Sequence, residues 1–303
     1  MADAERELLQ EARYDDVRNL YPMTAQSVGE SAPEREAHLR KAVVALVTSG
    51  DLDAARELAR GLDMRSSLVC AVALAEAGHA GLVEPEWLKP DSPVGNESID
   101  LWMNCGFQLE LAGNQRAARH CYETVLKHAD NCSGLAANAE YRLGLTLEAL
   151  GDYSGATDHY RRSAEIAGRP FPAAQDLARF QLAKLLYLAE EYADSVRQLE
   201  QLQVGASLPA AYVPEVTLRL AAALCRLGNT EEAKRALVEW RARFPEGKTE
   251  VDVRIDLFLA ETYRSEGSYG AARDCLRKVV ENPAAAHQTR TRALQTLDRL
   301  PRS

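Results

Sequence analysis

Residues 214–245, PEVTLRLAAALCRLGNTEEAKRALVEWRARFP, contain the spacing of small, large and turn residues that decides the fold. Leu220 and Ala221 belong to an apolar set at helical spacing, which predicts one face of a first helix. Gly228 suits the left-handed position at a helix end, and a second apolar set follows before Pro245. The stretch therefore predicts two amphipathic helices packed as an antiparallel hairpin.

The same spacing recurs along the chain. The turn residues follow one another at intervals of 38, 39, 38 and 39 residues, at Gly113, Gly151, Glu190, Gly228 and Gly267. In the third unit Glu190 stands where glycine would relieve the helix end, so we expect a strained or less tight turn there. Ser195 stands where the other units have a small alanine.

The pattern resembles the tetratricopeptide repeat, a helix–turn–helix unit with Leu-Gly or Leu-Ala in the first helix, then Ala, an aromatic residue and Pro. Its opening is matched by Trp102, Cys105 and Gly106, with cysteine in place of the usual leucine. The resemblance covers about residues 99–283 well and 34–88 weakly. It implies an all-α fold, a right-handed α-solenoid of tandem helix–turn–helix hairpins, of a bacterial type with long repeats.

The expected organisation has four parts. They are an amino-terminal amphipathic helix at 1–20, degenerate helical hairpins at 34–93, five repeats at 99–283 and a carboxy-terminal capping helix at 285–303. Three leucines of the capping helix are expected to cover the fifth repeat: Leu294, Leu297 and Leu300. Its arginines are expected to face water: Arg290, Arg292 and Arg299.

Composition narrows the class of protein. The 303 residues are 46% hydrophobic, which excludes a disordered chain, and the good helix formers Ala, Leu, Glu and Arg are abundant. A formal charge of −9 argues against nucleic acid as a partner, because binding it needs a basic surface. No apolar run approaches the roughly 20 residues of a membrane helix, and the amino terminus lacks a signal-like apolar core. We therefore expect a cytoplasmic protein without membrane insertion.

Motifs of catalysis are absent from the sequence. It has no Gly-x-Ser-x-Gly elbow, no His-Glu-x-x-His and no dinucleotide-binding glycine motif after a strand. Gly247-Lys248-Thr249 mimics the end of a phosphate-binding loop, but Ala242 replaces the first glycine and a helix precedes it. We therefore expect neither an enzyme nor a cofactor.

A zinc site is a weak alternative at Cys121, His128 and Cys132, which are spaced by seven and four residues. One core thiol and two surface residues explain the same pattern, so we expect no metal.

In a solenoid of this kind the first helix of each hairpin lines a concave groove. One equivalent position is apolar in all five repeats: Met103, Tyr141, Phe180, Leu218 and Leu257. Neighbouring positions add Phe107, Arg142, Lys184, Arg219, Arg226, Arg254 and Phe258. An alternative interpretation is that the apolar series packs against neighbouring helices instead of facing a partner.

These residues predict a protein–protein interaction adaptor or scaffold, which binds a peptide or helical segment of a partner through apolar anchors and orienting arginines. Family members that grip a free carboxyl terminus place Lys and Asn at two groove levels, and this chain has no such pair. Two alternatives stay open. One is a peptide-responsive regulatory protein that acts through a partner, and the other is a structural subunit that homo-oligomerises. The amino-terminal helix could also fill the groove itself.

Overall fold

The computed structural model describes residues 32–60, 62–89, 96–130, 133–166, 171–203, 207–208, 212–243 and 249–301. Within these ranges all regular secondary structure is helical, which confirms the prediction of an all-α fold. The predicted helix at 1–20 lies outside the described residues.

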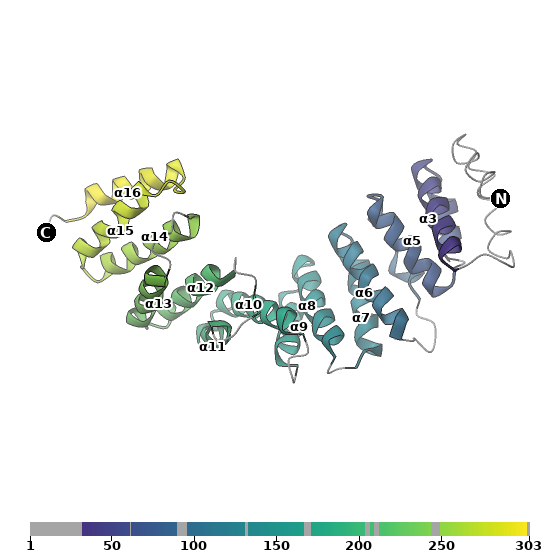
Figure 1. Cartoon of the computed structure of the whole chain (residues 1–303), viewed down its shortest axis with the longest axis horizontal. Coiled ribbons are helices and arrows are strands. Elements are labelled where there is room, and N and C mark those ends of the chain that lie inside the picture. Colours follow the sequence, from purple (N-terminus) through teal and green to yellow (C-terminus); the bar gives the residue numbers. More distant parts are fainter. Residues whose placement is uncertain are drawn as a thin grey trace. The chain divides into compact units, whose positions relative to one another are not determined.

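The helices form a series of antiparallel pairs (Figure 1). The α-helices are α3 (Ala32–Thr48), α4 (Leu52–Arg60), α5 (Met64–Glu76), α6 (Asn96–Leu111), α7 (Gln115–His128), α8 (Gly134–Ala149), α9 (Tyr153–Glu165), α10 (Pro172–Leu188), α11 (Tyr192–Gln203), α12 (Val213–Arg226), α13 (Thr230–Arg243), α14 (Glu250–Ser265), α15 (Tyr269–Glu281) and α16 (His287–Arg299). Two short 3-10 helices, η1 (Ala80–Leu82) and η2 (Pro85–Trp87), follow α5.

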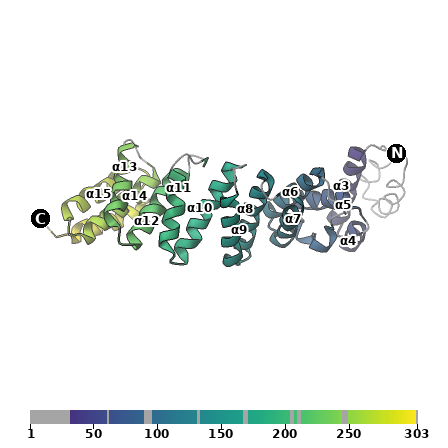
Figure 2. The ribbon, with the colours of Figure 1, turned by 90° about the horizontal axis from the view of Figure 1, so that it is seen from below.

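The chain divides into two compact units, Met1–Gln175 and Asp176–Ser303, which we call unit 1 and unit 2. In unit 1, α6 packs on α7 and α8 on α9, and each hairpin contacts the next (Figures 1 and 2). In unit 2, α12 packs on α13 and α14 on α15, and α16 packs on α15. A hairpin stack of this kind exposes its first helices on one side and its second helices on the other.

The turns between first and second helices have the predicted left-handed residue. Gly113, Gly151 and Gly228 each have φ of 85°, and Gly267 has φ of 76°. Glu190 adopts the same conformation with φ of 65°, and it is the one non-glycine residue with positive φ among the described residues. Of the two expected outcomes, this conformation favours a strained turn, because a side chain in this region clashes with its own backbone.

We expect Glu190→Gly to raise the free energy of unfolding by about 1 kcal/mol, because it removes this clash from a turn that already has glycine geometry. Urea denaturation of the variant and wild type measures the change. Gly228→Ala is the reverse control, and it should lose stability because alanine is strained at φ of 85°. A lower unfolding midpoint for Glu190→Gly would contradict the expected strain.

Inside the hairpins of unit 1, a glycine of the first helix lies against a buried tyrosine of the second. A Cβ built on Gly144 would lie 2.5 Å from Cε1 of Tyr160, and one on Gly106 would lie 2.8 Å from Cε1 of Tyr122. Both tyrosines are fully buried. The two helices therefore approach so closely that no side chain fits at the glycine.

Hydrogen bonds fix both tyrosine rings. The hydroxyl of Tyr122 donates to Glu110 at 2.6 Å, and that of Tyr160 donates to Glu148 at 3.0 Å. Burial is the largest of the effects that raise the pKa of both phenols, and the neighbouring glutamates raise it further. Each hydroxyl therefore stays protonated, and the ring cannot move without losing its hydrogen bond.

In unit 2, different residues form the contact between the first and second helix of each hairpin. Alanine and leucine stand at the equivalent positions, as the pairs Ala183 and Leu199, Ala221 and Leu237, and Ala260 and Leu276. Ser195, which replaces the expected alanine, is fully buried, and its hydroxyl donates to the carbonyl of Ala183 at 2.8 Å. The serine thus adds a hydrogen bond between α10 and α11.

Two predictions for the last helix, α16, are wrong, one for Leu294 and one for Arg290. Leu294 is 48% exposed, whereas Ala293 and Leu300 are buried. Arg290 is half-buried and donates to the carbonyls of Asn282 at 2.9 Å and Pro283 at 3.0 Å. Leu297 packs against the core of unit 2, as predicted. The buried side of α16 is therefore formed by Ala293, Leu297 and Leu300, with Ala293 in the place expected for Leu294.

Candidate functional site

Unit 2 contains a groove whose walls come from the three first helices α10, α12 and α14. The groove has a volume of about 520 Å³, within the range of about 300–1,000 Å³ that is typical of ligand pockets. We define the unit 2 groove by its lining residues Ala183, Tyr187, Glu215, Leu218, Arg219, Ala222, Arg254, Leu257 and Phe258. Five of the residues expected to bind a partner are among them: Leu218, Arg219, Arg254, Leu257 and Phe258.

The floor of the unit 2 groove is apolar. Leu218 is buried and belongs to the core of unit 2, while Leu257 and Phe258 pack against that core and stay half-buried. Ala222 is also half-buried and lies on α12, one turn after Leu218. An apolar side chain that covered this floor would remove the remaining surface of these residues from water.

One carboxylate and two guanidinium groups form the polar rim of the unit 2 groove. Arg254 donates from Nη1 to Oε2 of Glu215 at 2.7 Å. Nη2 of Arg219 lies 3.0 Å from Oε1 of the same glutamate. The three side chains are partly exposed, with exposed fractions of 24% for Glu215, 35% for Arg219 and 50% for Arg254.

Phe180 packs against Arg219 of the rim. Its ring is 5% exposed and does not line the groove. The guanidinium of Arg219 lies 5.3 Å from the ring centroid, and Tyr212 packs edge-to-face on the ring with the centroids 5.3 Å apart. Phe180 therefore orients Arg219 and is itself a packing residue.

The family comparison gives a local match. A family model described as tetratricopeptide repeat matches residues 112–174. This segment is a tetratricopeptide repeat segment. It contains α7, α8 and α9, together with the turn at Gly151 and the contact between Gly144 and Tyr160.

Solved structures with similar folds include repeat proteins. The carboxy-terminal part of a TPR repeat-containing protein from Cytophaga hutchinsonii is 12% identical with a TM-score of 0.53, over 97% of this chain and 99% of its own. The apo form of RapI is 10% identical with a TM-score of 0.49, over 98% and 97%. BtubC from P. vanneervenii is 16% identical with a TM-score of 0.42, over 79% and 90%. The first likeness shows a tetratricopeptide-type fold and nothing more. The comparison with curated proteins gives no match.

The expected groove residues of the repeats in unit 1 have other surroundings. Met103 and Tyr141 are buried, with 9% and 8% of their surface exposed. The guanidinium of Arg142 lies 4.5 Å from the ring centroid of Phe107 and donates to Glu110 at 3.1 Å. In unit 1 the guanidinium of Arg142 therefore has its partners on the neighbouring helix α6.

Arg226 and Lys184 lie on the first helices of unit 2 but do not line its groove. Arg226 donates from Nε and Nη2 to the hydroxyl of Tyr192 at 3.0 and 2.7 Å. Tyr192 in turn packs edge-to-face on Tyr187 at 5.3 Å. Arg226 thus stabilises one end wall of the groove through these rings. Lys184 is half-buried on α10.

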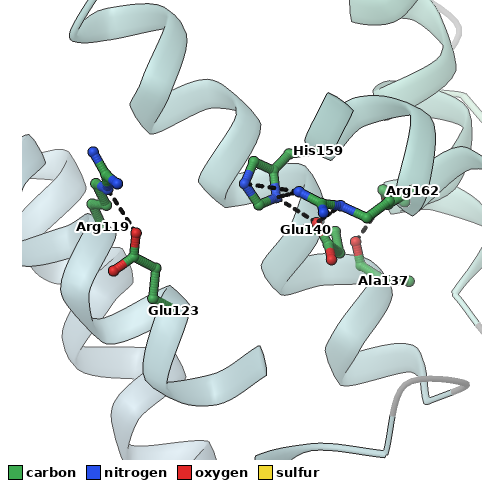
Figure 3. A network of polar contacts seen from close by, with 7 residues as sticks. Arg119, Glu123, Ala137, Glu140, His159 and Arg162 are labelled. Atoms are coloured by element: carbon green, nitrogen blue, oxygen red, sulfur yellow. Dashed lines mark hydrogen bonds and ion pairs between the residues drawn. The ribbon is translucent and has the colours of Figure 1, made fainter. Parts of the chain in front are cut away.

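A polar cluster joins α8 and α9 inside the matched segment (Figure 3). Figure 3 shows His159 and Arg162 pointing toward Glu140. Nδ1 of His159 lies 2.6 Å from Oε2 of Glu140, and Nε of Arg162 lies 3.3 Å from the same oxygen. Next to them, Ser163 donates to the carbonyl of Ala137 at 2.7 Å. These polar groups satisfy one another between the two helices of one repeat, so we interpret the cluster as a structural contact.

Two of the three residues of the weak zinc alternative lie within the described ranges. Cys121 is fully buried and His128 is exposed, while Cys132 lies outside the described residues. Within the described ranges, no group of three or more His, Cys, Asp and Glu side chains could hold a metal ion. Burial raises the pKa of Cys121, and it raises that of Cys275 to about 11. These thiols are therefore protonated packing residues at neutral pH.

Sequence reasoning missed Glu215 as a groove residue. It lies four residues before Arg219 on α12, and an acidic residue at that spacing before an arginine favours an ion pair. That pattern could have placed Glu215 beside Arg219. Its second partner, Arg254, comes from another helix and could not be read from spacing alone.

None of the helices in the described ranges is long and apolar enough to cross a membrane.

Proposed function

We propose that this protein is an adaptor that binds an extended or helical segment of another protein in the unit 2 groove. Tetratricopeptide repeats are in general scaffolds for protein–protein interaction, and they typically have no catalytic activity. The observation that carries the proposal is the groove itself, because its apolar floor and charged rim come from three successive first helices. Peptide recognition commonly combines such apolar anchors with a few orienting polar groups.

The test uses a displayed library of random linear peptides and three purified proteins. Ala222→Trp fills the groove from a half-buried position on its floor. Val238→Trp is the matched control, because Val238 is 47% exposed on α13 and does not line the groove. Circular dichroism should give the same helical signal for all three proteins.

We expect wild type and Val238→Trp to enrich the same peptides, and Ala222→Trp to lose at least about tenfold in affinity for them. Fluorescence anisotropy with the enriched peptides measures that loss. Equal binding by all three proteins would show that peptides bind outside the groove. The absence of any enriched peptide with wild type would refute peptide binding.

A further inference from the structure

The rim of the unit 2 groove has an excess of positive charge. Glu215 is the only carboxylate among the lining residues, and both Arg219 and Arg254 are paired with it. The lining therefore carries a formal charge of +1, in a chain whose formal charge is −9. This balance favours a ligand with a negative charge.

Two ion pairs elsewhere in unit 2 have an equal or the opposite charge balance. Among the described residues Arg264 pairs with Glu261 alone, and Lys234 lies between Glu231 and Glu266. In these pairs each cation is matched by at least one carboxylate of its own. The two arginines that share Glu215 thus differ in charge balance, because one carboxylate neutralises only one of their two positive charges.

The geometry leaves donors available to a ligand. Half of the side-chain surface of Arg254 is exposed, and Nη2 of Arg254 lies 3.5 Å from Oε1 of Glu215, at the limit of a hydrogen bond. The side chain of Arg219 is 35% exposed, whereas its Nε is buried without a hydrogen-bond partner among the described residues and is not accessible to a ligand. A second carboxylate can therefore bind this pair of guanidinium groups, and it would compete there with Glu215.

We propose that the unit 2 groove selects segments in which an aspartate or glutamate side chain stands next to an apolar one. This inference rests on the proposed function and names the chemistry of the partner. The ligand carboxylate binds Arg254 and displaces Glu215 from it, while the neighbouring apolar side chain covers Leu218 and Leu257. The acidic group belongs to a side chain, because a segment that crosses three first helices continues beyond the groove in both directions.

Glu215 is then a built-in competitor that occupies the arginines while the groove is empty. Its removal should strengthen binding of an acidic segment, although it deletes a polar contact of the free protein. Glu215→Gln raises the formal charge of the lining from +1 to +2 and keeps the shape of the side chain. A purely structural role of Glu215 would predict weaker binding or no change instead.

The experiment compares three synthetic peptide libraries that share leucines on both sides of one central position. The first library has glutamate at that position and the second has glutamine, and both are acetylated and amidated so that their termini carry no charge. The third has glutamine at the centre and a free terminal carboxylate. Binding of each library to wild type is measured by fluorescence anisotropy at low and high salt.

We expect the glutamate library to bind roughly tenfold more tightly than the glutamine library, with a preference that shrinks at high salt. Arg254→Gln should abolish that preference. Glu215→Gln should raise the affinity for the glutamate library roughly threefold. The matched controls are Arg264→Gln and Glu261→Gln, a pair on α14 outside the groove, and neither should change binding.

Two results would overturn the inference and keep the proposed function. One is equal binding of the glutamate and glutamine libraries that is lost in Ala222→Trp, and the other is a preference for the library with the free terminal carboxylate. Weaker binding of the glutamate library by Glu215→Gln would refute the competitor role. Binding of all libraries that is unchanged in Ala222→Trp, or no binding at all, would reject the proposed function itself.

Discussion

Replacing Gly144 with alanine is expected to lower the free energy of unfolding by about 2 to 3 kcal/mol, because the added methyl group has no space. Its Cβ would lie 2.5 Å from Cε1 of Tyr160, whose hydroxyl is held by Glu148 at 3.0 Å. Helix propensity alone predicts the opposite, since alanine gains about 0.5 to 1 kcal/mol over glycine inside a helix. The sign of the change therefore decides whether packing or propensity dominates at this position.

The double variant Gly144→Ala with Tyr160→Leu tests the cause. It copies the pair that unit 2 uses at Ala183 and Leu199. We expect it to lose less stability than the two single variants together, by at least about 1 kcal/mol in a double-mutant cycle from urea denaturation. Strictly additive losses would show that the tyrosine ring is not the obstacle.

The turns show which features of this chain can be predicted from local sequence rules. The left-handed residue that ends a first helix is required by the local backbone conformation alone. All five turn positions could therefore be predicted from their spacing, including the one that Glu190 occupies. The pairing of a glycine with a tyrosine could not be predicted in the same way. It depends on two helices at once, and the sequence offers Gly106 and Gly144 only as ordinary variants of a small-residue position.

The candidate site shows the same limit. Helical periodicity places Leu218 and Leu257 on the first helices at equivalent positions, but it does not say how deeply each is covered. Leu218 is buried and Leu257 is half-buried, although both are leucines. In α16, Leu294 is 48% exposed although it was expected to be covered, while the adjacent Ala293 is buried. Burial is thus a property of the packed neighbours, which spacing within one helix does not contain.

Replacing Arg241 with glutamine is expected to lower the stability of unit 2 by about 3 kcal/mol at neutral pH, because it leaves two buried carboxylates without their cation. Arg241 of α13 donates from Nη1 to Asp252 at 2.9 Å and from Nη2 to Asp256, and both aspartates of α14 are buried. Arg235→Gln is the matched control on α13. Its exposed pair with Glu232 should contribute less than about 1 kcal/mol.

The loss caused by Arg241→Gln should depend on pH in a defined direction. Burial raises the pKa of Asp256 above its ordinary value, and Arg241 opposes that rise. A carboxyl whose pKa is higher in the folded than in the unfolded protein binds more protons when folded, so stability falls as pH rises between the two values. Removal of Arg241 raises the folded pKa of Asp256 further and widens that range. The stability loss measured by urea denaturation should therefore be smaller at about pH 5 than at about pH 7. An equal loss at both pH values would mean that Arg241 acts through the packing of its side chain, and that its charge does not hold α13 to α14.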